Sequence, residues 1–234
     1  MDFRTIHVYS NSGLDARAVA KEIAKVFPHC KVDVRPPFRY DDRIKHAMIS
    51  DMKQPFERQP KQPEVAMPLY DGFVLQRIFA ESIPVIESDH VHIIFTSLLT
   101  CTFSEDGWRY HGRAVTCGTP SIVSIPGIVE APAKPREFYL AQLGGQLDVV
   151  SLKKRFAGRF IDYGDDRMTA ACSLYALQAL FFFVTDGEPF CDDRKCMLFN
   201  PHWQEELILM IEKGRLCSRH RHVANKFNRK FVKR

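Results

Sequence analysis

The chain has 234 residues, 45% hydrophobic and 26% charged, which fits one large or two small folded domains and excludes a disordered chain. Its longest apolar run, residues 174–184, is far shorter than the roughly 20 residues of a membrane span, and the opening MDFRTIHVYS has no leader pattern, so we expect a cytoplasmic protein without a membrane span. The net charge is +5 but residues 215–234 alone carry +8, so the rest of the chain carries −3 and the basic character belongs to the C-terminal tail.

The first 35 residues predict a β-α-β unit. Residues 4–9 and 31–35 each have a strand pattern. Between them, hydrophobic residues recur at helical spacing: Leu14, Val19, Ile23, Val26 and Phe27. A unit of this kind favours parallel pairing of its two strands.

The next segment, residues 36–68, is polar and rich in proline, which is typical of an excursion over the surface. We expect a short helix around residues 41–52 within it. A helix around 71–81 and a strong strand at 90–97 follow.

A hairpin is predicted around the turn signal at residues 105–107, Glu-Asp-Gly. Its strands cover residues 99–103 and 108–117. A short strand at 121–125 and a proline-rich loop at 126–136 come next.

The remaining elements are helical. We expect helices at 136–143 and 149–158, and a longer one that starts after Asp165 or Asp166 and reaches Val184. The surface of the long helix is almost wholly apolar, which predicts a buried central helix, and Gly187 can end it. We therefore expect an α/β fold, with a small mixed sheet, a buried central helix and a C-terminal helical subdomain. The chain would have three parts: a domain of residues 1–187, a subdomain of residues 188–222 packed on it and a basic tail of residues 223–234.

The seven cysteines fall into two groups. Four stand singly in apolar patterns and are expected to be buried: Cys30, Cys101, Cys117 and Cys172. The other three stand near the C-terminus together with a histidine, and a helix expected from Pro201 to Gly214 separates the two pairs Cys191-x4-Cys196 and Cys217-x2-His220. Three thiolates and one imidazole suit a closed tetrahedral zinc site, so we predict one structural zinc ion there, which makes residues 188–222 a zinc-knuckle subdomain. The alternatives are a redox-active disulfide and three unrelated cysteines, with His222 and then His202 as substitutes for the fourth ligand.

The C-terminal half resembles the archaemetzincins. That family carries HExxHxxGxxH, then Cys-x4-Cys with a nearby methionine, and later Cys-x2-Cys, and its second metal site is structural. Here Met197 follows Cys196, and Gly187 stands four residues before Cys191. The segment QALFFFVTDGEPFCDDRKCMLFNPHWQEEL further resembles an archaeal family of metallopeptidase-like proteins. The resemblance covers about residues 170–222 and implies a metzincin-like scaffold.

The catalytic half of that motif is missing. In the family's register the two helical histidines fall on Leu180 and Val184, the glutamate on Phe181 and the third histidine on Phe190. None of these side chains can bind zinc or act as a general base. The resemblance therefore implies a non-catalytic protein that keeps its structural zinc and binds a peptide or protein partner.

Three further groups of residues are candidate sites. His90 and His92 alternate on a strand and share one face, so a metal-dependent hydrolase with a non-standard site at these residues and His111 is an alternative. A groove for an anion or peptide is the second candidate, and its expected lining is Arg109, His111, Arg113, Glu130 and Arg136. The third is the tail, where an apolar stripe of Val223, Phe227 and Phe231 is surrounded by basic residues: Lys226, Arg229, Lys230 and Lys233. Such a tail docks on the domain, binds nucleic acid phosphates or lies on an acidic membrane surface.

Overall fold

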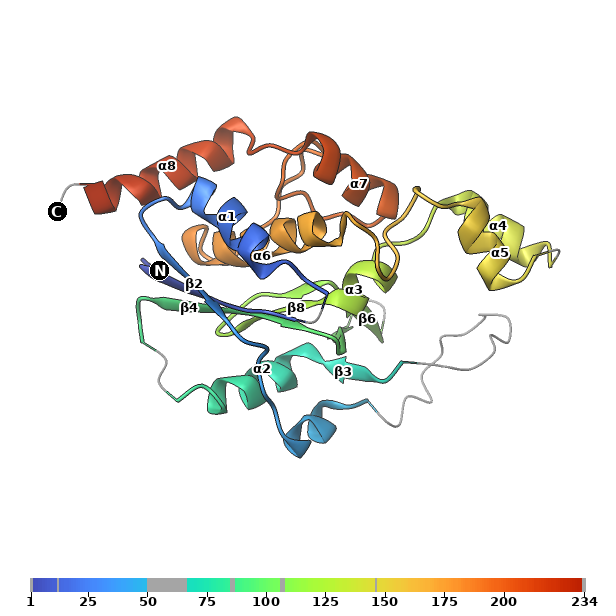
Figure 1. The fold of residues 1–234 in the computed structure, drawn as a ribbon, viewed down its shortest axis with the longest axis horizontal. Helices are drawn as coiled ribbons and strands as arrows, with labels where there is room; N and C mark the ends of the chain where they lie inside the picture. Colours follow the sequence, from blue (N-terminus) through green and yellow to red (C-terminus); the bar gives the residue numbers. More distant parts are fainter. Residues whose placement is uncertain are drawn as a thin grey trace.

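The computed structural model describes residues 2–11, 13–49, 67–84, 87–105, 108–145 and 147–232 (Figure 1). Predictions that concern residues 50–66, the turn residues 106 and 107, and Lys233 lie outside the described residues. The strands are β1 Thr5–Tyr9, β2 Lys31–Arg35, β3 Leu69–Asp71, β4 His90–Thr96, β5 Leu99–Ser104, β6 Arg109–Arg113, β7 Val115–Thr116 and β8 Ser121–Ser124. The helices are α1 Ala16–Val26, the 3-10 helix η1 Asp42–Ala47, α2 Gly72–Glu81, α3 Ile125–Glu130, α4 Arg136–Leu143, α5 Val149–Arg155, α6 Met168–Val184, α7 Gln204–Lys213 and α8 Ser218–Val232.

The main sheet has the strand order β2-β1-β4-β8-β7. Its first four strands are parallel and β7 is antiparallel, which confirms the predicted α/β class with a mixed sheet. Because side chains alternate along a strand, Ile6 and Val8 of β1 face the core, while His7 and Tyr9 lie on the opposite face. The predicted parallel β-α-β unit at the N-terminus is also confirmed.

Two helical layers cover this sheet (Figure 1). Helices α1 and α6 pack on one face, with α7 and α8 outside them, and α2 lies on the other face. Helix α6 is buried on nearly all sides, as its apolar sequence predicts. It ends where Gly187, at φ +95°, donates its N–H to Phe182 O at 2.9 Å.

A second sheet, β3-β5-β6, was not predicted. The hairpin of β5 and β6 exists, but the expected strand at 108–117 breaks at Ala114, and its second half, β7, belongs to the main sheet. The break coincides with close packing of helix α3, because a Cβ on Gly127 would lie only 2.0 Å from Arg113 O. The expected loop at 126–136 was therefore wrong in its first half. Ser124 caps α3 by accepting the Gly127 N–H at 2.9 Å.

Two other expected helices differ in extent. The helix expected at 41–52 is a 3-10 turn that stops at Ala47, because Met48 is extended and pairs with Tyr70 of β3. Helix α7 begins at Gln204 and not at Pro201, because the Glu206 carboxylate accepts the N–H groups just before Gln204.

The C-terminal segment shares the main core. Leu198, Leu207 and Phe227 pack in the same buried cluster as the sheet and α6. Helix α8 runs without a break through residues 222 and 223, so the predicted boundary between the zinc-knuckle subdomain and the basic tail falls inside a helix. No helix among the residues that the structure describes combines the length and apolar character needed to cross a membrane.

Candidate metal centre

Three backbone features bring the predicted zinc ligands together. The loop before α7 folds back on itself, because Cys191 N–H donates to Leu198 O at 2.8 Å. Cys196, at the far end of this loop, forms a β-bridge with Arg215 and so lies beside the chain that leads into α8. Cys217 immediately precedes α8, and His220 stands on the first turn of that helix. The four ligand atoms lie within 4.8 Å of one another.

The distances within this cluster fit one tetrahedral ion. Bond lengths of ~2.3 Å for sulfur and ~2.0 Å for nitrogen imply S···S distances of about 3.8 Å and S···N distances of about 3.5 Å. The Sγ atoms of Cys191 and Cys217 are 3.9 Å apart. His220 Nδ1 lies 3.2 Å from Cys217 Sγ and 3.7 Å from Cys196 Sγ. The donor set and its spacing thus suit zinc, bound by His220 through Nδ1.

The thiols differ in their electrostatic surroundings. Burial raises the pKa of Cys191 and raises that of Cys196 to about 12. Burial acts in the same direction on Cys217, but backbone hydrogen bonding near His220 and the two neighbouring thiols outweigh it, and the pKa of Cys217 lies below its usual range. Cys217 is therefore the thiol most easily ionised in the absence of metal.

The structure distinguishes among the three candidate histidines. His220 is fully buried and contacts the ring of Phe181 edge-on at 5.7 Å, whereas His222 and His202 are exposed and lie outside the cluster. Zinc binding by the four residues stays a prediction. Among the described residues, His220 Nε2 is buried without a hydrogen-bond partner, so no protein oxygen orients the ring from behind.

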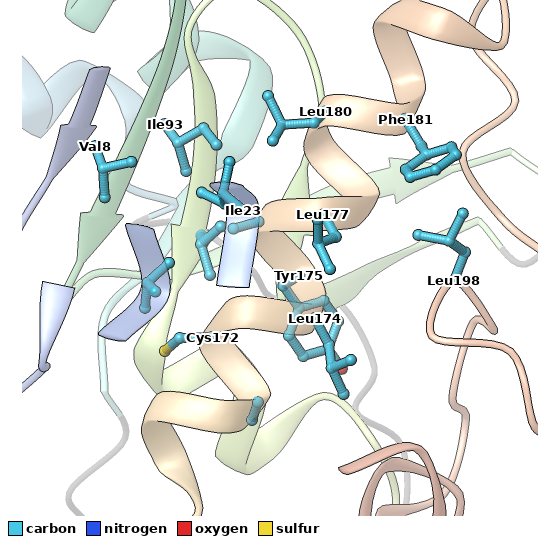
Figure 2. Close-up of a cluster of buried hydrophobic side chains, with 14 of the residues drawn as sticks. Val8, Ile23, Ile93, Cys172, Leu174, Tyr175, Leu177, Leu180, Phe181 and Leu198 are labelled. Carbon is cyan, nitrogen blue, oxygen red and sulfur yellow. The ribbon is translucent and has the colours of Figure 1, made fainter. Parts of the chain in front are cut away.

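Core residues occupy the positions of the two missing helical histidines and the missing glutamate. Leu180 and Phe181 are fully buried and leave α6 on different sides, Leu180 toward the sheet and Phe181 toward the segment of Leu198 (Figure 2). Val184 is partly buried against the same core, and Phe190 is 40% exposed. Helix α6 is therefore built as a packing element in this chain.

The four single cysteines behave as small hydrophobic residues. Cys30, Cys101 and Cys172 are buried, and Cys117 is partly buried. Burial raises the pKa of Cys30 to about 11 and raises those of the other three to about 12. None of them has the ionised thiol that nucleophilic chemistry near pH 7 needs.

The predicted groove residues lie on two elements. Arg109, His111 and Arg113 share β6, the edge strand of the small sheet. Arg113 Nε donates to Thr102 Oγ1 at 2.7 Å, and Arg109 Nε lies 3.3 Å from His111 Nε2. Helix α3 packs on β6, but Glu130 at its end pairs with Lys134 at 3.3 Å. Arg136 begins α4 and is exposed.

The strand histidines do not meet His111, which belongs to the other sheet. They meet His7 of β1, a residue that the sequence prediction missed. His7 Nε2 lies 3.0 Å from His90 Nδ1, and the rings of His7 and His92 stack at 4.7 Å. Burial lowers the pKa of His7 and lowers that of His92 to about 4, which favours neutral imidazoles near pH 7. The sequence did hold a signal for this contact. If the strands predicted at 4–9 and 90–97 pair in parallel, alternate residues of both lie on one face of the sheet.

A cavity of about 420 Å³ opens at the carboxyl ends of β1 and β4. Its polar lining comes from Asn11, Arg39, Thr96 and Ser97, and Phe38 and Tyr40 line it with their rings. In parallel sheets this end is where ligands bind, at the point where the strand order reverses. Here the order reverses between β1 and β4, since the chain reaches β2 on one side of β1 and β4 on the other.

The basic residues of α8 face away from the core. The apolar stripe of the helix packs inward, where Phe227 is 3% exposed and its ring lies 4.7 Å from that of Phe3. Lys226 and Arg229 are exposed, and Lys230 pairs with Asp2 at 2.5 Å. Docking of the tail on the domain, one of the three predictions for it, is thus seen for the described part of α8.

A comparison with protein families gives a match. The model of a family described as "Probable metallopeptidase family (DUF6775)" matches residues 2–227, nearly the whole chain. No curated protein and no solved structure matches the chain.

Proposed function

We propose that this chain, which belongs to the probable metallopeptidase family (DUF6775), is a non-catalytic, metzincin-like protein with a structural zinc ion. The cluster of three cysteines and His220 carries the proposal. Four protein ligands fill a tetrahedral shell, so no position is left for the water that a zinc peptidase activates. Thiolate ligands also favour a reducing compartment such as the cytoplasm.

The surroundings of the cluster support a structural role. The ligands come from the loop at residues 191–196 and from the start of α8, and α7 lies between these two segments in the sequence. Bound zinc would supply a cross-link there and so fix α7 and α8 on the core. The nearby faces of α6 offer Leu180 and Phe181, which can neither bind an ion nor accept a proton.

The non-catalytic proposal predicts that the zinc-loaded protein cleaves no peptide bond. We expect a quenched fluorescent peptide library and unfolded protein substrates to be hydrolysed no faster than in buffer. The zinc content of the sample, measured by elemental analysis, shows that the site is loaded. Peptidase activity that co-purifies with the chain and disappears on chelation would contradict the proposal.

We place the partner at the edge strand β6. An unpaired strand edge can accept an extended peptide by main-chain hydrogen bonds. The exposed side chains of Arg109 and Arg113 flank this edge, so an acidic peptide fits it best.

The exposed basic face of α8 favours a second candidate function, binding of nucleic acid phosphates. These basic residues belong to a helix whose apolar side packs in the core, so their positions relative to the domain are fixed. Such binding weakens steeply as salt rises, because condensed counterions are released from the nucleic acid.

Two charge reversals separate these functions, and each is the control for the other. Under the peptide proposal, replacing Arg109 and Arg113 by Glu weakens binding of an acidic peptide library by about tenfold, and replacing Lys226 and Arg229 by Glu does not. Fluorescence anisotropy with labelled acidic peptides and labelled single-stranded and double-stranded DNA and RNA measures both. Salt-sensitive nucleic acid binding that only the α8 variant loses would support the second candidate, and peptide binding insensitive to the β6 variant would remove the first.

A further inference from the structure

Helices α4 and α5 form a hairpin that projects from one end of the molecule (Figure 1). Gly145, at φ +66°, permits the turn between the two helices. At the base of the hairpin, Arg159 Nη2 lies 3.1 Å from Glu137 of α4 and 2.6 Å from Glu205 of α7. The interior is a small apolar core of its own: Phe138, Leu152, Phe156 and Phe160. The base is thus tied to the rest of the fold, while the end with the turn points away from it.

The turn end of this hairpin exposes apolar side chains. Leu143, the last residue of α4, is 70% exposed, and Val150, in the first turn of α5, is 76% exposed. These are the two most exposed large hydrophobic side chains in the part of the chain that the structure describes. Leu140, one turn before Leu143, and Val149 are exposed beside them. Single exposed apolar residues are common on protein surfaces, but four at one hairpin end form a patch.

Basic side chains stand one helical turn behind this apolar patch. Lys154 follows Val150 by four residues on α5, so the two lie on one side of the helix. Lys154 and Arg155 are exposed and have no carboxylate partner among the described residues, whereas Lys153 forms an ion pair. Between residues 139 and 155 the sequence has one acid, Asp148, and its carboxylate caps α5. The hairpin end therefore combines an apolar surface with a net positive charge.

We propose that this hairpin end inserts into the surface of an anionic lipid bilayer. The apolar side chains enter the boundary between head groups and acyl chains, and Lys154 and Arg155 contact the lipid phosphates. A membrane suits this convex end better than a protein partner does. Four apolar side chains fall far short of the roughly 20–30 residues that each partner contributes to a standard protein interface. The surface is separate from the cysteine cluster and the proposal does not depend on the proposed function.

Co-sedimentation of the zinc-loaded full chain with lipid vesicles tests this proposal. We expect binding to vesicles of equal parts phosphatidylcholine and phosphatidylglycerol, and binding weaker by about tenfold or more to phosphatidylcholine alone. The double variant Leu143→Asp, Val150→Asp should bind the mixed vesicles about tenfold more weakly, because charged side chains resist entry into the bilayer. The double variant Lys154→Glu, Arg155→Glu should show a similar loss, which shrinks as salt rises because salt screens the attraction.

Two control variants change exposed residues elsewhere on the molecule. Phe73→Asp alters an exposed apolar side chain of α2. The double variant Lys226→Glu, Arg229→Glu alters α8, which lies at the opposite end of the molecule (Figure 1). Both controls should bind the mixed vesicles within about twofold of the wild type, because charges farther away than the screening length contribute little. All of the substituted side chains are exposed, so every variant should keep the wild-type far-UV circular dichroism spectrum.

Three results would overturn the proposal. The first is no binding to either kind of vesicle. The second is loss of vesicle binding in the α8 variant and not in the hairpin variants, which would place the membrane contact on the basic tail. The third is self-association in sedimentation velocity that the double aspartate variant abolishes without changing vesicle binding, which would make the hairpin end an interface with a second copy of the chain.

Discussion

Replacing Cys196 by Ser should remove zinc from the protein and destabilise its C-terminal third. Cys196 is fully buried, and its Sγ lies 3.7 Å from His220 Nδ1, so a serine oxygen cannot take its place as a soft ligand. Loss of a bound metal is among the few single changes that cost more than about 4 kcal/mol. Elemental analysis of the purified variant and urea unfolding, each compared with the wild type, measure the two effects.

The loss of stability in Cys196→Ser should be largest in the helices that the bound ion would connect. Hydrogen exchange is expected to rise in α7 and α8 and to stay low in β1 and β4. Cys117→Ser is the matched control, because Cys117 is only partly buried and lies outside the cluster, and it should keep zinc. A Cys196→Ser protein that retains its zinc would show that these four residues are not the ligands.

The second large effect is expected from Phe227→Ala on α8. The ring of Phe227 is 3% exposed and lies 4.7 Å from the ring of Phe3 and 5.4 Å from that of Phe27. Truncating a buried phenylalanine removes apolar burial and leaves a cavity, which costs about 3–5 kcal/mol. Chemical denaturation of the zinc-loaded protein measures this loss in the free energy of unfolding.

The control for this change is Phe190→Ala. Phe190 is 40% exposed, so its removal should change the free energy of unfolding by about 0.5 kcal/mol or less. Phe227 stands seven residues after His220 on the same helix, so zinc affinity should fall as well if packing of α8 positions that ligand. A loss in stability below about 1 kcal/mol would mean that Phe227 of α8 is not packed against Phe3 and Phe27 in solution.

The cysteine cluster and the histidine cluster differ in how visible they are in the sequence. Cysteines are rare, and the pairs 191/196 and 217/220 each lie within one short segment, so spacing alone marked them as ligands. The histidine cluster has no such spacing, because His7 and His90 are 83 residues apart. A histidine in a strand pattern is unremarkable until its neighbour on the next strand is known.

Local pattern determined most of the elements of this chain. Period-two strands, the amphipathic α1 and the almost wholly apolar α6 follow from side-chain periodicity, and the end of α6 follows from the left-handed conformation that Gly187 adopts. The absence of the catalytic residues is also visible in the sequence, because Leu180, Phe181 and Val184 can neither bind zinc nor act as a base in any fold. These features depend on neighbours within a few residues, which the sequence displays directly.

Tertiary structure alone decided which elements meet. The break at Ala114 follows from the close approach of Gly127 to Arg113 O, a contact between β6 and α3 that no local pattern encodes. The meeting of His7 with His90 and His92, and not with His111, follows from the strand order that sets β1 beside β4. Strand order is chosen by how all the helices cover both faces of the sheet, so it depends on the packing of the whole chain and not on the residues that it brings together.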